Sequence, residues 1–171
     1  MSDLRFIKKV DISSASSVAN VQDVFSSDYT FYKVIWDDIA LVGSAGWIDI
    51  RLINENGNAL RNSNYCGAHM DMNSSGIGTF QSANQSYFDR GLIYNNGTQG
   101  ACQEMTVFNP YEDDRYTFIS AASRNGAGSG DSGDYKLLVF KNITRVTGIQ
   151  AVQRNGYTWT GSVKVYGMRY E

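Results

Sequence analysis

The chain has 171 residues, a formal net charge of −2 and a hydrophobic content of 42%, which fits one domain whose core needs no disulfide or metal. The near-neutral charge excludes a nucleic-acid binder that relies on a basic surface. No stretch reaches the length of a membrane span, and residues 1–10 lack the apolar segment of a signal peptide, so we expect synthesis in a cytoplasm and no membrane contact.

Residues 4–12 predict the first strand, because apolar and charged side chains alternate along them. The apolar side chains expected on one face are Leu4, Phe6, Val10 and Ile12. The basic residues Lys8 and Lys9 suit the edge of a sheet, where charge discourages pairing with other chains. Both lysines are therefore candidate contact residues.

The next segment has a different pattern. Val18, Val21 and Phe25 recur at helical spacing behind a Ser-rich start that could cap a helix. We expect a short helix near residues 16–25, or else a compact turn.

Residues 31–41 and 47–53 predict two strands of alternating pattern. The side chains expected in the core are Tyr32, Val34 and Trp36 in the first strand and Ile48, Ile50 and Leu52 in the second. Asp49 is expected to point outward. Asn56 and Gly57 predict a tight hairpin turn, because both residue types tolerate positive φ.

Further strands are predicted over 65–72, 80–94, 102–109, 115–122, 135–141, 146–153 and 157–168. Residues 124–134 are rich in Gly, Ser and Asp and predict a flexible loop. Asn155 and Gly156 predict a turn that joins the last two strands as a hairpin. The fold class expected from these elements is all-β: a single antiparallel, jelly-roll-like β-sandwich domain over residues 1–171, with at most one short helix.

No group of residues predicts a catalytic or metal site. Residues three apart on a strand face opposite sides, so Cys66 cannot use His69 as a base, whereas His69 and Asp71 share a face. One His and two distant Cys do not supply a zinc site, and the acidic residues at 112–114 and at 131 and 134 are expected to be solvated carboxylates. We therefore expect a protein that is not an enzyme and has no cofactor or metal, with free thiols at Cys66 and Cys102.

Aromatic residues near turns are candidate ligand or interface residues, because exposed Tyr and Trp can stack on sugars or anchor a protein interface. These are Trp47, Tyr157 and Trp159. The alternative is that their side of the sheet packs into the core of a second sheet. Arg169 and Tyr170 near the C-terminus are further candidate contact residues.

Two segments carry a resemblance to a known group. Residues 24–34 read VFSSDYTFYKV, and residues 161–168 read GSVKVYGM, preceded by VTGI at 146–149. They resemble virion structural proteins and fibre-tip domains of tailed bacteriophages of the β-sandwich type. In such a fold Phe25, Tyr29 and Tyr32 would plug one end of the sandwich. Gly161 and Gly167 would let the last strand bend at its ends.

The resemblance implies a virion component that is made in a host cytoplasm. Because one domain fills the chain, we expect a capsid decoration or cement protein that binds the major capsid protein or other virion proteins and stabilises the assembled head. A homotrimer is expected, since shells offer threefold positions. The alternative is the tip of a tail or neck fibre that recognises a host surface glycan or receptor.

Overall fold

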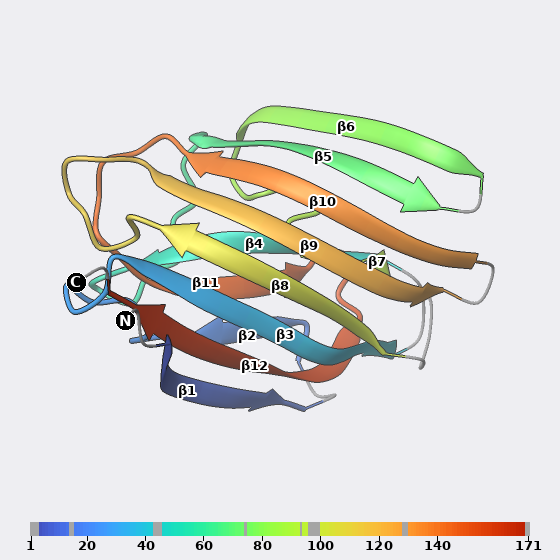
Figure 1. Ribbon diagram of the computed structural model, residues 1–171, viewed down its shortest axis with the longest axis horizontal. Coiled ribbons are helices and arrows are strands. Elements are labelled where there is room, and N and C mark those ends of the chain that lie inside the picture. Colours follow the sequence, from blue (N-terminus) through green and yellow to red (C-terminus); the bar gives the residue numbers. More distant parts are fainter. Residues whose placement is uncertain are drawn as a thin grey trace.

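The computed structural model describes residues 4–13, 16–42, 46–73, 75–92, 94–95, 100–127 and 130–169. These residues form two antiparallel sheets that pack face to face, with the wider sheet in front in Figure 1. The predicted all-β sandwich is confirmed. Within the described ranges there is no helix long and apolar enough to cross a membrane.

The larger sheet has eight strands. In spatial order they are β1 (Leu4–Ile12), β12 (Thr158–Met168), β3 (Phe31–Val42), β8 (Ala101–Phe108), β9 (Thr117–Ala127), β10 (Gly130–Phe140), β5 (Tyr65–Asn73) and β6 (Gly76–Gln85). The smaller sheet has the order β2 (Val18–Val21), β11 (Val146–Gln153), β4 (Gly46–Asn54) and β7 (Tyr94–Asn95). From β1 to β5 and from β10 to β12 the chain changes sheet after every strand.

The core lies between the sheets and follows the predicted alternation. Tyr32, Val34 and Trp36 of β3 are fully buried, as are Ile48, Ile50 and Leu52 of β4. Trp159 of β12 packs against Trp36, with 6.2 Å between the ring centroids. Side chains of this size dominate the free energy of burial, at about 25 cal/mol per Å² of apolar surface.

The expected helix near residues 16–25 is wrong. The segment contains the strand β2, which pairs with β11 at the edge of the smaller sheet. Ala19 and Val21 are buried whereas Val18 is exposed, so the period is two rather than 3.6. Backbone hydrogen bonds to the neighbouring strand override the helical spacing of the valines, whose branched side chains also favour strands.

Two other expectations about connections are also wrong. Residues 124–134 belong largely to a long hairpin, since β9 and β10 pair up to Ala127 and Gly130. The last two strands form no hairpin: β11 pairs with β2 and β4, and β12 pairs with β1 and β3. The turn at Gly156, where φ is +78°, therefore leads from one sheet to the other.

The two segments that carry the phage resemblance lie against each other. β12 pairs with β3, and Gly167 lies so close to Tyr29 that an added Cβ would be 2.4 Å from the Tyr29 ring. Tyr32 stacks edge-on against Phe25 and Tyr29, and its hydroxyl donates to the Ser26 carbonyl at 2.7 Å. Phe25, Tyr29 and Tyr32 thus close one end of the sandwich, as expected.

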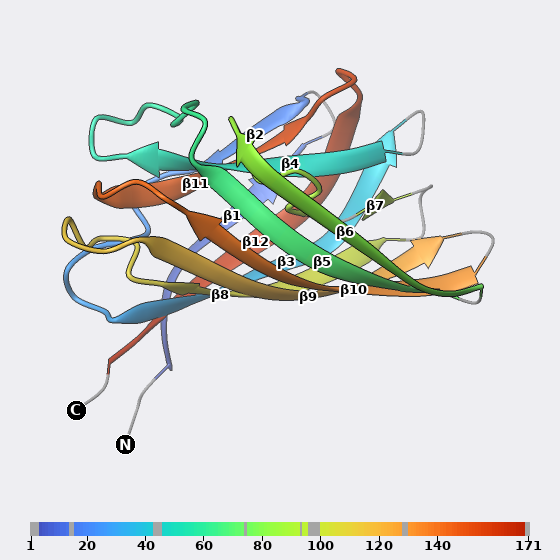
Figure 2. The same cartoon turned by 90° about the horizontal axis from the view of Figure 1, so that it is seen from above.

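β1 is an edge strand, as predicted, but its apolar side chains do not share one face. A β-bulge between Phe6 and Lys8 reverses the alternation. Leu4 and Phe6 are exposed, at 46% and 60%, whereas Ile12 is buried. β1 and β12 run side by side, and the start of β1 lies next to the end of β12, where Leu4 pairs with Met168 (Figure 2).

Candidate functional site

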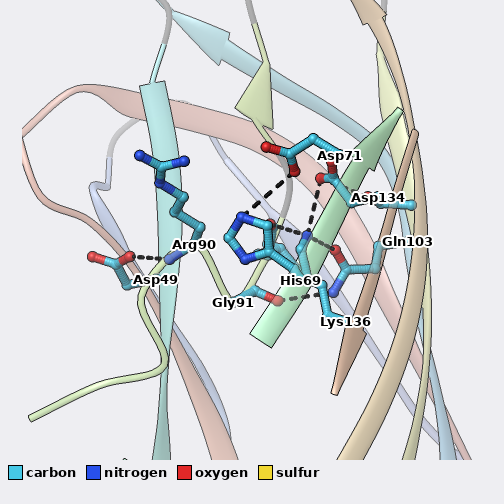
Figure 3. A network of polar contacts seen from close by, with 10 residues as sticks. Asp49, His69, Asp71, Arg90, Gly91, Gln103, Asp134 and Lys136 are labelled. Carbon is cyan, nitrogen blue, oxygen red and sulfur yellow. Dashed lines mark hydrogen bonds and ion pairs between the residues drawn. The ribbon is translucent and has the colours of Figure 1, made fainter. Parts of the chain in front are cut away.

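A buried network of polar side chains lies on the inner face of the larger sheet (Figure 3). Its centre is Lys136 of β10, whose side chain has no exposed surface. The Lys136 ammonium donates to the Leu92 carbonyl at 2.7 Å and to Gln103 Oε1 at 3.1 Å, and it lies 3.2 Å from Asp134 Oδ2. Its three donors thus all have acceptors, as a buried ammonium requires.

The network joins three strands to the segment that follows β6. Ser123 of β9 donates to Asp134 Oδ2 at 3.0 Å, and Gln103 Nε2 of β8 donates to the Gly91 carbonyl at 3.0 Å. Because Asp134 and Lys136 are two residues apart on β10, they share the face that also carries buried Leu138 and Phe140. The strand alternation thus holds both charges inside the sandwich.

His69 and Asp71 of β5 extend the network toward the surface. As predicted, they share a face, with His69 Nε2 3.5 Å from Asp71 Oδ1. The His69 side chain is only 2% exposed and the Asp71 side chain 27%. The His69 ring stacks on Phe80 at 4.8 Å and lies 6.2 Å from the Trp47 ring. A cation lies beside the same aromatic pair, since the Arg90 guanidinium is 4.2 Å from the Phe80 centroid and 4.9 Å from that of Trp47.

Burial sets the protonation of these groups. Burial and a hydrogen bond with Asp134 raise the pKa of Asp71 to about 6. Burial would also raise the pKa of Asp134, but the Lys136 ammonium and hydrogen bonds from its neighbours outweigh this and lower it. Burial and the nearby Lys136 cation lower the pKa of His69, and burial lowers the pKa of Lys136. Below about pH 6 the two carboxyl groups therefore share a proton, and His69 is neutral near pH 7.

The chemistry available here is the sharing of a proton between Asp71 and Asp134 in the interior of the sandwich. A general base must reach the proton it removes, at about 2.6–3.2 Å or through one water. The His69 imidazole is covered by Phe80 and Trp47, so a substrate could reach it only if these side chains moved. Among the described residues, no group of three or more His, Cys, Asp or Glu side chains is arranged to hold a metal ion.

A second buried charge lies on β4. Asp49 was expected to point into solvent, but its side chain is only 2% exposed, and Arg154 Nε lies 2.5 Å from its Oδ2. The Arg90 backbone N–H also donates to Asp49 Oδ1 at 2.9 Å. The expectation is wrong because residues 88–92 cover this side of β4, through a β-bridge between Phe88 and Ile50. Burial raises the pKa of Asp49 to about 6 despite Arg154.

The opposite face of the larger sheet points away from the core and carries exposed apolar side chains. We call it the apolar outer face; it consists of exposed Met70, Met72, Ile77, Phe108, Phe118, Tyr135 and Leu137 and of half-buried Phe31 and Val139. Strand register aligns four of these, Val139, Phe118, Phe108 and Phe31, in one row across β10, β9, β8 and β3. A shallow depression of about 320 Å³, lined by Phe108, Phe118, Leu137 and Val139 among others, lies in this face.

The structure does not bring the predicted contact residues together. Trp159 is fully buried, so it is a core residue and not the surface residue that was expected. Trp47, on β4, is half-buried beside the His69 ring. Tyr157 is 36% exposed and stays a surface residue. The alternative stated for these aromatic residues, that their side belongs to the core, applies to Trp159.

The basic candidates lie at two separate places. On β1, Lys8 is half-buried and donates to the Gln22 carbonyl at 2.8 Å, whereas Lys9 is exposed and pairs with Asp11. Arg169 is exposed and folds back, with its Nε donating to the Asp28 carbonyl. Tyr170 lies outside the described residues.

The residues at the centre of the network were not predicted from the sequence. Asp134 was expected in a solvated acidic loop, whereas it is 3% exposed. The signal was present in the sequence. Leu138 and Phe140 define the inner face of β10, and because every second residue of a strand lies on the same face, Asp134 and Lys136 point inward as well. Cys66 and Cys102 are both free thiols, and Cys66 lies on the face opposite His69.

Comparison with known proteins gives no family. No family model matches the chain, and no curated protein matches it. Among solved structures, a double mutant of the alginate lyase Aly36B in complex with an alginate tetrasaccharide is similar at 11% identity and a TM-score of 0.35, over 95% of this chain and 80% of that one. Infectious bursal disease virus, Gt strain, gives 13% identity and a TM-score of 0.15 over 98% of this chain and 40% of that one.

The similarity to an alginate lyase contradicts the expectation that this chain is not an enzyme. That expectation, which rested on the lack of a recognisable catalytic group in the sequence, is withdrawn. At this TM-score the similarity supports no particular activity in its place.

Proposed function

We propose that the chain is a virion component that binds the surface of an assembled phage head through its apolar outer face. The role as a virion component is proposed from the sequence resemblance to virion structural proteins of tailed bacteriophages. The contact surface follows from one observation: large apolar side chains are exposed together on a sheet face that no described part of the chain covers.

The size of this face supports a protein partner. Leu137 is 57% exposed, Phe118 45% and Phe108 40%. Taking about 200 Å² for a large side chain, the exposed members contribute roughly 600–700 Å² of apolar surface, at or above the largest patch of a typical monomer. A standard protein interface buries about 800 Å² on each partner.

The charges on the same sheet indicate which part makes the contact. Lys33 pairs with Glu104 at 2.7 Å, and Lys164 pairs with Asp37 at 3.0 Å, so β3 and β12 carry ion pairs next to Phe31. The apolar side chains concentrate over β8, β9, β10 and β5. We therefore place the contact on these four strands, with the ion pairs at its rim, which is the arrangement of typical protein interfaces.

The test is co-sedimentation of the purified chain with heads assembled from the major capsid protein of the same phage. We expect the wild-type chain to sediment with the heads, and Leu137→Asp to weaken this binding at least tenfold, because it places an unpaired charge in the buried contact. Ile143→Asp is the matched control, since Ile143 is 54% exposed but lies in the connection between β10 and β11. Wild-type protein that stays in the supernatant, or Leu137→Asp that binds as well as Ile143→Asp, would refute the proposal.

A further inference from the structure

The edge strand β6 is long and carries no charge. It is the last strand of the larger sheet and pairs only with β5, so no described strand pairs with its other side (Figure 1). Its ten residues, GIGTFQSANQ, contain no charge and no proline. Sheet edges normally carry charges, prolines or bulges, or are very short, because their free N–H and C=O groups can otherwise pair with another chain.

The other described edges show such protection. β1, at the opposite end of the same sheet, has four charged residues, which are Arg5, Lys8, Lys9 and Asp11, and a bulge. In the smaller sheet, β2 has only four residues and β7 only two. Of the four described edges, β6 alone is both long and uncharged.

A bulge limits the regular part of β6. The pairing with β5 shifts between Gln85 and Ser82, and Asn84 has a φ of +55°. The bulge leaves Gly76 to Ser82, seven residues that pair with β5 without a register shift, although Gly76 at the start has a φ of +132°. On the outer side of this segment Ile77 is 70% exposed, and Thr79 and Gln81 are exposed as well.

We propose that two copies of this chain pair through β6, antiparallel and related by a twofold axis, so that their larger sheets become one. The register that pairs the whole segment places Thr79 opposite Thr79 of the second copy, a favourable cross-strand pair. It also places each Gly78 opposite a Phe80, so no two bulky side chains of the inner face meet across the contact. No like charges meet, because the segment has none.

The same geometry explains why assembly stops at two copies. A twofold contact uses the same surface on both chains and closes on itself. The remaining edge of the joined sheet would be β1 at each end, where antiparallel pairing of two copies would bring its lysines together. The dimer does not depend on the proposed head binding, although it would set two apolar outer faces side by side and strengthen binding by avidity.

The test is sedimentation velocity of the purified chain over a range of concentrations. We expect a species of twice the 19.0 kDa chain mass that dissociates on dilution. Thr79→Lys should weaken the dimer at least tenfold, because it places two lysines opposite each other. Ala122→Lys is the matched control, since Ala122 is exposed and lies in the same cross-strand row, on β9, away from the edge. It should leave the dimer unchanged.

A mixture of Thr79→Lys with Thr79→Glu tests the twofold axis itself. We expect the two variants, each largely monomeric, to form a mixed dimer, because opposite charges then meet. A wild-type chain that is monomeric or trimeric, or a dimer that Thr79→Lys leaves intact, would overturn the proposal. Leu137→Asp should keep the dimer, so loss of head binding and loss of dimerisation are separate results.

Discussion

Removal of the buried Lys136 ammonium should destabilise the fold strongly. Lys136→Met keeps the length of the side chain but removes the donor to Gln103 Oε1 and the Leu92 carbonyl, and it leaves the Asp134 charge without its cation. Breaking a buried ion pair by removing one partner costs about 3–5 kcal/mol. For a domain of this size, each kcal/mol lowers Tm by roughly 2–4 °C, so we expect a drop of at least about 6 °C.

Urea denaturation followed by tryptophan fluorescence measures this loss directly. The control is Lys9→Met, because Lys9 pairs with Asp11 at the surface and such pairs contribute about 1 kcal/mol or less. The double variant Lys136→Met/Asp134→Leu removes both charges, so it should lose less than the sum of the two single variants, by at least about 1 kcal/mol. A loss below about 1 kcal/mol for Lys136→Met alone would refute the reasoning, because the ammonium would then contribute no more than a surface charge.

Three further predictions concern other parts of the chain. The raised pKa of Asp71, about 6 against an ordinary value of 3.8, gives stability that is complete below pH 3.8 and is lost as pH rises through 6, so Asp71→Asn should gain stability relative to wild type as the pH rises from 4 to 7; chemical denaturation over this range would show an unchanged difference if the reasoning is wrong. Gly167→Ala should cost about 1–3 kcal/mol, because the new methyl group overlaps the Tyr29 ring, and a Tm equal to that of wild type would contradict this. Trp159→Ala should cost about 3–5 kcal/mol because this side chain is fully buried, whereas the exposed Tyr157→Ala should cost less than about 1 kcal/mol; equal losses in thermal denaturation would argue against the core position of Trp159.

Local alternation predicted the fold class because each strand has to bury one side. In β3 and β4 the apolar side chains fall on every second residue, and the structure buries the same ones. The pairing of strands could not be predicted in this way. Alternation shows that residues 146–153 and 158–168 are strands, but it contains no information on which sheet each one joins.

The candidate site was harder to predict than the core. Sequence composition suggested that Asp134 lies in a flexible, solvated loop, since Gly and Ser precede it. Its burial depends on Lys136 two residues later and on acceptors from β8 and from residues 91–92, which are distant in sequence. The alternation with Leu138 and Phe140 indicates which face Asp134 and Lys136 share, but the partners that make a buried ion pair stable are distant in sequence and leave no local pattern.

The position of β12 has a consequence for biosynthesis. This strand lies between β1 and β3, although the ribosome produces it after both. A nascent chain that has not yet reached residue 158 therefore holds β1 without a neighbour and leaves one side of β3 open. Translation that stops early would release a product with free strand edges, and such products aggregate readily. Folding of this domain is thus expected to finish only when residues 158–168 have left the exit tunnel.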